Sequence, residues 1–464
     1  MFGRKVRIVG DLTPLGETPF DAIPGAMPRT TPFHACLEPL NRTGVWKHWS
    51  GYLVAPQYQY SLNTEYYAIR SGAALLDTSP LFKYRFRGGD AAALLGRVLA
   101  RDPGACPVGR AQYTCWCDEG GWIEQDGVIL HVEEDDWLLT AAEPALRHFR
   151  EAARGLGLSD VTVEDVSDAF GILALQGPHA HDVLAGLTDA VAPLRFFGLT
   201  RTSIEGCDVI VSRTGYTGDL GYELWIRSGD AETVWRALTM AGRGHGLTPI
   251  GTTALKMARV EAGLLLMGVD FHPSRFAWVD AQRDSPLELG WSWMFRKLED
   301  DGRDFVGRAA IEGELRDGSS RWRMVGLAVD WEDYERVHAD AGILPPLHEL
   351  YAESTMSVYR RGETPWDYAG YASSFLASTL LRRPIALAKL PLELAEPGTE
   401  VDLEVQVVRQ PKTVLSRVVR LPFYDPPRKT APVDAPSPVA RAAGAGSIGG
   451  SAPSGASSAA EAVR

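Results

Sequence analysis

The chain of 464 residues is short of several features that would assign it to a class at once. Its five cysteines, an odd number in so long a chain, argue against a disulfide framework. No run of about 18 apolar residues occurs, so we expect no membrane span. The basic start, residues 1–7, is not followed by an apolar stretch with a small-residue cleavage site, which argues against a secretory signal. We therefore expect a reducing, cytoplasmic location.

Positive charge is also scarce, because 59 acidic residues outnumber 47 lysines and arginines and the formal net charge is -12. This balance argues against broad binding to nucleic acid or to an anionic membrane surface. A local basic pocket for an anionic ligand remains compatible with it. The hydrophobic share of 45% and the charged share of 23% are those of an ordinary globular protein with material for a large core.

Short motifs for phosphate loops, zinc proteases and serine hydrolases are missing, and the motifs that do occur are weak. A glycine pattern at 444–449 has low-complexity sequence on both sides, without the strand and helix that dinucleotide binding needs. Cys115 and Cys117 would share one face of a strand, which favours core packing over a zinc site. For His179 and His181 no third ligand can be named, so we predict surface histidines at a helix start and no metal site.

The pattern along the chain divides it into four parts. Residues 1–30 resemble an extension with little regular structure, and 31–300 mix helical and strand signals. Residues 301–425 contain strand patterns, of which 401–407 alternates apolar and polar positions. From 426 to 464 Pro, Ala, Gly and Ser dominate, and we predict a disordered tail. Within the second part we expect helices at 91–99, 230–242 and 252–262 and a strand at 127–132.

Six segments in order resemble the aminomethyltransferase (glycine cleavage T protein) family, which includes related tetrahydrofolate-dependent demethylases. The most specific is R-T-G-Y-T-G-D-L-G-Y-E-L at 213–224. The others are G-R-A-Q-Y-T at 109–114, a glycine pair with acidic residues at 120–126, L-A-L-Q-G-P at 173–178, R-V-E-A-G at 259–263 and D-F-V-G-R at 304–308. The similarity covers about residues 45–425.

This resemblance implies an α+β, three-lobed folate-binding fold with a C-terminal β-barrel-like domain. Two lobes would be built from 31–300 and the barrel from 301–425, with tetrahydrofolate in a central channel. It also implies a transferase that moves a one-carbon unit onto N5 of tetrahydrofolate. Such a reaction needs alignment of N5 with the donor carbon, charge stabilisation and a proton for the leaving group.

The family pattern assigns roles to four residues. Asp126 would be the catalytic carboxylate near N5, although Asp126-Gly127 on its own is also a turn dipeptide. Glu223 would pair with the amino-pyrimidine edge of the pterin, because a carboxylate matches two adjacent N–H donors. Tyr113 and Tyr216 would line the pterin channel. Without the resemblance, Glu223 would be an exposed strand carboxylate, and Tyr113 and Tyr216 would be core or edge aromatics.

Several positions depart from the family pattern on the side of the one-carbon donor. An expected Arg is Leu255, the segment S-H-M is Ser79-Pro80-Leu81, and an expected Tyr is Leu130. A further Tyr near the C-terminus has no clear counterpart beyond Phe423-Tyr424. We therefore predict a small-molecule methylated donor, such as a methylamine, a methylsulfonium or an aryl methyl ether.

Two alternatives to this hypothesis stay open. The first is a glycine cleavage aminomethyltransferase that acts on a lipoyl carrier protein. The second is a non-catalytic folate-binding protein, against which the absence of a cysteine at 259–263 argues.

Overall fold

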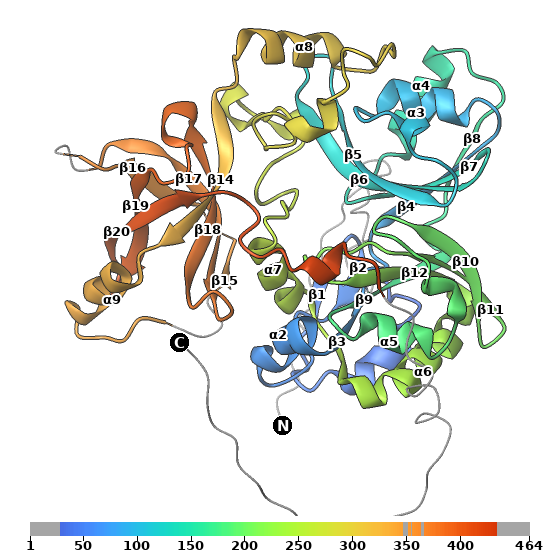
Figure 1. Cartoon of the computed structure of the whole chain (residues 1–464), viewed down its shortest axis with the longest axis horizontal. Coiled ribbons are helices and arrows are strands. Elements are labelled where there is room, and N and C mark those ends of the chain that lie inside the picture. The colour runs from blue at the N-terminus through green and yellow to red at the C-terminus, as the bar shows by residue number, and fades with distance from the viewer. Residues whose placement is uncertain (1–27, 347–350, 354, 363–365, 434–464) are drawn as a thin grey trace, which may run out of the picture. The chain divides into compact units, whose positions relative to one another are not determined.

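Figure 1 shows the computed structural model of the chain, which describes residues 28–346, 351–353, 355–362 and 366–433. Residues 1–27 of the predicted extension and 434–464 of the predicted tail, with the glycine pattern at 444–449, lie outside these ranges. No helix in the described ranges is long and apolar enough to cross a membrane.

The first sheet has six strands in the order β10-β11-β12-β9-β3-β13, antiparallel except for the parallel pair β13 and β3. Its strand β9 alternates strictly, because Leu173 and Leu175 face one core cluster and Ala174 faces another. Helices α5 and α6 contribute to the first cluster, and α2 and α7 to the second. The bounds are β3 Ala73–Asp77, β9 Phe170–Gln176, β10 Leu199–Ile204, β11 Cys207–Ser212, β12 Gly221–Arg227, β13 Leu247–Pro249, α2 Leu62–Ser71, α5 Ala180–Ala185, α6 Ala231–Ala241 and α7 Thr252–Glu261.

The second sheet has five antiparallel strands in the order β5-β6-β7-β4-β8. Helices α3 and α4 bury their apolar sides on it around Phe149 and Trp116. The backbone amide of Ala111 on β5 donates to the carbonyl of Phe197 before β10, which joins this sheet to the first. The bounds are β4 Phe82–Arg87, β5 Arg110–Cys117, β6 Ile123–Glu133, β7 Asp136–Ala141, β8 Thr162–Asp165, α3 Ala91–Val98 and α4 Leu146–Gly155.

The C-terminal part is a closed barrel of six strands, β14-β18-β17-β16-β19-β20, with β15 attached to β17. The alternation predicted at 401–407 is confirmed, since Val401, Leu403, Val405 and Val407 all point into the barrel core. The C-terminal barrel expected from the resemblance is therefore confirmed. The bounds are β14 Trp322–Val329, β15 Tyr351–Ala352, β16 Met356–Arg360, β17 Tyr368–Ser378, β18 Arg383–Pro391, β19 Glu400–Val407, β20 Gln410–Val419 and α9 Trp331–Ala339.

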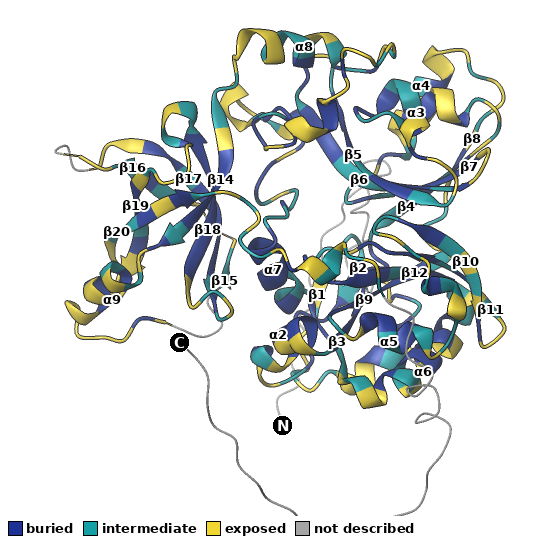
Figure 2. Ribbon diagram, in the orientation of Figure 1, coloured by how far each residue is buried: buried dark blue, intermediate teal, exposed yellow. Residues whose placement is uncertain are grey.

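Short elements and α8 connect these units, and Figure 2 shows that α8 carries more exposed positions than the sheets do. They are α1 His34–Leu37, η1 Glu38–Leu40, β1 Lys47–Trp49, β2 Tyr52–Val54, η2 Pro103–Ala105, η3 Asp189–Val191, η4 Ser228–Asp230, η5 Gly242–His245, η6 Ser274–Phe276, η7 Asp280–Gln282, η8 Ser292–Phe295, α8 Arg308–Asp317, η9 Leu392–Leu394 and η10 Pro427–Lys429.

Residues 421–433 run from the barrel back to the first sheet, and we call them the C-terminal strap. The amide of Tyr424 donates to the carbonyl of Glu261, and Arg213 donates to the carbonyls of Arg428, Lys429 and Ala431. The prediction of a disordered tail from 426 is therefore wrong for 426–433. Its composition gave no sign of these contacts, because the anchoring arginine lies more than 200 residues earlier in the chain.

Candidate functional site

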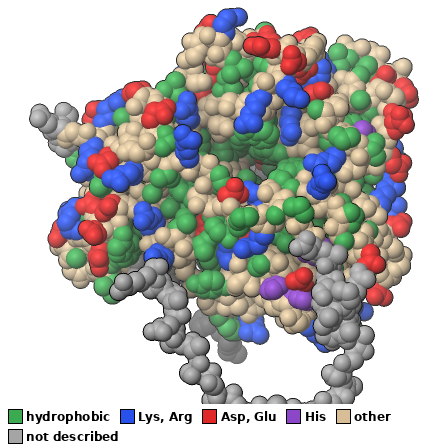
Figure 3. Space-filling view, in the orientation of Figure 1, with side chains coloured by type: hydrophobic (Ala, Val, Ile, Leu, Met, Phe, Trp, Pro, Cys, Tyr) green, Lys and Arg blue, Asp and Glu red, His purple; other side chains and the backbone are tan. Residues whose placement is uncertain are grey.

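A cavity of about 1470 Å³ lies between the two sheets, the loop 264–269 and the barrel. All four residues proposed from the sequence line it: Tyr113, Asp126, Tyr216 and Glu223. Figure 3 shows a hollow on this face with hydrophobic side chains inside it and lysines and arginines around it. The volume suits a ligand larger than most drug-sized molecules, for which pockets of about 300–1,000 Å³ are usual.

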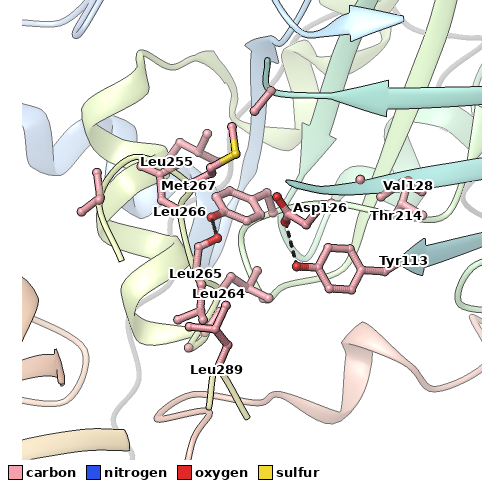
Figure 4. Close-up of a pocket in the computed structure, with 18 of the residues that line it drawn as sticks. Tyr113, Asp126, Val128, Thr214, Leu255, Leu264, Leu265, Leu266, Met267 and Leu289 are labelled. Atoms are coloured by element: carbon pink, nitrogen blue, oxygen red, sulfur yellow. Dashed lines mark hydrogen bonds between the residues drawn. The ribbon is translucent and has the colours of Figure 1, made fainter. Parts of the chain in front are cut away.

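Asp126 and Tyr113 form a pair on neighbouring strands. The Tyr113 hydroxyl donates to Oδ2 of Asp126 over 2.7 Å, as Figure 4 shows. Asp126 lies inside β6, opposite Cys115, and not in a turn before the strand. Gly127 follows because a Cβ there would lie 2.2 Å from the carbonyl oxygen of Thr140 on β7. The turn interpretation of Asp126-Gly127 is therefore wrong.

The environment of Asp126 makes its carboxyl group a weaker acid than usual. Burial within the protein raises the pKa of Asp126 to about 6 from 3.8, and the hydrogen bond from Tyr113 opposes this rise. The carboxylate is still partly accessible, because it opens into the cavity. At pH 7 to 8 Asp126 is thus mostly ionised but weakly solvated. Its carboxylate can therefore stabilise a positive charge that develops beside it.

Glu223 on β12 reaches the cavity at the other sheet. The Thr214 hydroxyl donates to its Oε2, and Ser212 and Thr214 share a hydrogen bond of 2.6 Å. Burial raises the pKa of Glu223, and the bond from Thr214 lowers it. No donor for Oε1 occurs among the described residues, so this oxygen is open to a ligand in the cavity.

The segment carrying Tyr216 is shaped by one buried amide. Gln176 donates to the carbonyls of Thr214 and Tyr222 and accepts from the Thr217 hydroxyl. A Cβ on Gly215 would lie 2.0 Å from this amide, which is why glycine is needed there. The L-A-L-Q-G-P and R-T-G-Y-T-G segments therefore fold as one unit.

Tyr216 in turn fixes the loop across the cavity. Its hydroxyl donates to the carbonyl of Leu265. The loop continues through Leu266 and Met267, and Figure 4 shows these side chains with Leu255 across the cavity from Asp126 and Tyr113. This side of the cavity is apolar.

Two residues that hold the cavity wall in place, Arg259 and Glu261, were given no role from the sequence. Arg259 pairs with Asp270 at the end of this loop and donates to Ser374 on β17 over 2.8 Å. Glu261 accepts from Arg70 over 2.7 Å and from Ser378 on the same barrel strand over 2.6 Å. The R-V-E-A-G motif was the available signal, but Arg70, Ser374 and Ser378 lie more than 100 residues from it.

The comparisons with known proteins agree with this geometry. The profile of the GCVT N-terminal domain matches residues 39–297, and that of the glycine cleavage T-protein C-terminal barrel domain matches 341–425. An aminomethyltransferase of Saccharopolyspora erythraea is 30% identical over 399 residues, covering 86% of this chain and 98% of the relative. One of Streptomyces coelicolor is 33% identical over 368 residues, with coverage of 78% and 88%.

The chain belongs to the aminomethyltransferase (glycine cleavage T protein) family. It is thus an aminomethyltransferase-like transferase. The crystal structure of glycine cleavage system aminomethyltransferase T from Bartonella henselae has the same fold, with a TM-score of 0.71 at 22% identity over 86% of this chain and 99% of that one.

The other sequence motifs of this aminomethyltransferase-family chain lie away from the cavity. Cys115 and Cys117 are buried core residues, as predicted. His181 is buried and bonds the Tyr222 hydroxyl, so the prediction of surface histidines holds only for His179. The latter lies with Asp182 and His245, whose potential ligand atoms are all within 4.8 Å of one another. These three side chains could hold a metal ion, which the sequence did not reveal.

Proposed function

We propose that this chain moves a one-carbon unit onto N5 of tetrahydrofolate, with Asp126 as the catalytic carboxylate. The observation that carries the proposal is the paired, weakly solvated Asp126 in the wall of a cavity large enough for folate. Tetrahydrofolate supplies the amine nucleophile. Asp126 would orient this amine and stabilise the positive charge that develops on alkylation.

Glu223 on β12 and the two tyrosines of the cavity suit the pterin. The open Oε1 of Glu223 offers an acceptor beside the one held by Thr214, which fits a pair of adjacent N–H donors. The tyrosine hydroxyl of Tyr113 keeps the Asp126 carboxylate in one orientation, and the Tyr216 ring lines the space between them. These contacts support a role for Tyr113, Tyr216 and Glu223 in folate binding.

Aminomethyl transfer from a lipoyl carrier protein is our first candidate reaction. The relatives named aminomethyltransferase share 30–33% identity over 78–86% of this chain, which supports it over the small methylated donor favoured from the sequence. A small methylated donor is the second candidate. It is favoured by Leu255, which stands in the cavity wall where the family pattern has an arginine, beside the apolar loop 264–267.

A transfer assay separates the two candidates. The protein is incubated with tetrahydrofolate and either an aminomethylated lipoyl carrier protein or a set of N-, S- and O-methyl compounds. Formation of methylenetetrahydrofolate with the carrier supports the first candidate, and methyltetrahydrofolate from a small donor supports the second. Failure of tetrahydrofolate to bind in calorimetry would rule out both.

A further inference from the structure

One cation in the cavity wall has a fixed position and no carboxylate partner among the described residues. Arg101 follows α3 and lines the same cavity as Asp126. Its guanidinium carbon lies 5.3 Å above the ring of Trp293, and its Nη1 donates to the carbonyl of Tyr113 over 3.2 Å. Arg101 thus touches the residue whose hydroxyl holds Asp126.

The other cations of the lining divide into two groups. Three are already neutralised by carboxylates, as the pairs Lys256 with Glu353, Arg323 with Glu396 and Lys429 with Asp425. Lys47, Arg110 and Arg420 make no side-chain hydrogen bond, ion pair or ring contact with the described residues, so no residue of that part of the chain fixes their charged ends. Within the described chain, Arg101 alone in this lining is both held in place and without a carboxylate.

This arrangement has an energetic cost without a ligand. Burial lowers the pKa of Arg101, whereas the Asp270 carboxylate helps to hold the pKa of Arg259 above its usual range. A partly buried guanidinium has lost water and gained no anion in return. An arriving carboxylate would remove that cost and form charge-assisted hydrogen bonds.

The unused donors of Arg101 remain accessible. One of its five N–H donors is used by the Tyr113 carbonyl. Among the described arginines, only the Nε atoms of Arg213, Arg259 and Arg283 are both fully buried and without a hydrogen-bond partner. The unpaired nitrogens of Arg101 are therefore accessible to solvent. A planar ligand group can therefore reach them from the cavity.

We propose that Arg101 binds a carboxylate group of a ligand held in the cavity. The two sources of such a group are the glutamate moiety of folate and an acid group on the one-carbon donor. The assignment of these sources rests on the proposed function, whereas anion binding by Arg101 does not.

The test compares Arg101→Gln, which removes the charge but keeps a planar amide, with the wild type. Arg154→Gln is the matched control, because Arg154 is exposed on α4 and outside the cavity lining. Calorimetry measures the affinity of each full-length protein for tetrahydrofolate and for the amide of tetrahydropteroate, which lacks the glutamate and has no free carboxylate. Dimethylglycine and a methoxybenzoate, each with its uncharged amide, are then titrated into the protein saturated with tetrahydrofolate.

We expect Arg101→Gln to weaken one carboxylate ligand by about 10- to 100-fold, the usual size for charge-assisted hydrogen bonds. If folate is the source, affinity falls for tetrahydrofolate and not for the amide of tetrahydropteroate. If the donor is the source, both folates bind as before and the preference for acid over amide is lost. The control should match the wild type in every titration.

The proposal is wrong if neither folate nor either acid distinguishes Arg101→Gln from the wild type, including the case in which no acid binds. Binding of an acid that Arg101→Gln weakens, without any binding of tetrahydrofolate to the wild type, would instead refute the proposed function and leave the role of Arg101 standing. Circular dichroism and melting curves of Arg101→Gln show whether a loss comes from misfolding.

Discussion

Replacing Asp126 by Asn should slow the reaction and stabilise the protein at the same time. Asn keeps the size of the side chain and can still accept the hydrogen bond of Tyr113, but it removes the charge. If Asp126 stabilises charge in the transition state, turnover should fall about 10²–10³-fold while the affinity for tetrahydrofolate changes only a few fold. A residue that only supports the strand would leave turnover unchanged.

The gain in stability follows from the raised pKa. A pKa of about 6 in the folded protein, against 3.8 ordinarily, means that the folded state holds a proton that the unfolded state has lost between these values. The contribution of this group to stability therefore falls as pH rises through the window from about 4 to 6. At about 1.4 kcal/mol per pKa unit the full cost is about 3 kcal/mol, reduced by the partial contact of Asp126 with solvent.

Asp126→Asn should thus be more stable than the wild type by about 1–3 kcal/mol at pH 7.5, and by about half as much at pH 5. Urea unfolding at the two pH values measures this difference. The wild-type rate of transfer should fall about tenfold per pH unit below pH 6, because only the ionised carboxylate acts. Wild-type turnover in the variant, or equal stability at pH 7.5, would refute the reasoning.

Three further variants test the site and its supports. Glu223→Gln should weaken tetrahydrofolate binding by about 1.5–3 kcal/mol in calorimetry, and unchanged affinity would remove Glu223 from the pterin site. Gly215→Ala should destabilise the fold by about 1–3 kcal/mol in urea unfolding because its Cβ would overlap Gln176, whereas Gly229→Ala, with nothing within 4 Å, should be neutral; equal effects would contradict this account. Arg428→Ala leaves the buried Asp219 without its bidentate partner, so amides of the C-terminal strap should exchange faster, and unchanged protection would show that the strap is held elsewhere.

The sequence predicted best what depends on neighbours along the chain. Helix 252–262 and the alternation at 401–407 follow local periodicity, and both appear in the structure as α7 and β19. The resemblance brought Asp126 and Glu223 to one cavity although 97 positions separate them. Local sequence alone would have placed Asp126 in a turn.

What escaped prediction depends on partners distant in the chain. The charge state of Asp126 is set by burial between two sheets, which no single segment encodes. Arg101 stands out only when the structure shows which cations of the cavity have carboxylate partners. The ordering of 426–433 likewise depends on Arg213, far from that segment.

Two side chains of α7 connect the barrel strand β17 to the cavity wall. Arg259 joins the loop that faces Asp126 to Ser374, and Glu261 joins α2 to Ser378. A hydrogen bond between a hydroxyl and a buried charged group contributes about 1.5–3 kcal/mol. Movement of the barrel away from α7 would therefore break hydrogen bonds of the two side chains that support the cavity wall. A ligand that enters by such a movement must bring enough binding energy to rebuild the wall around itself.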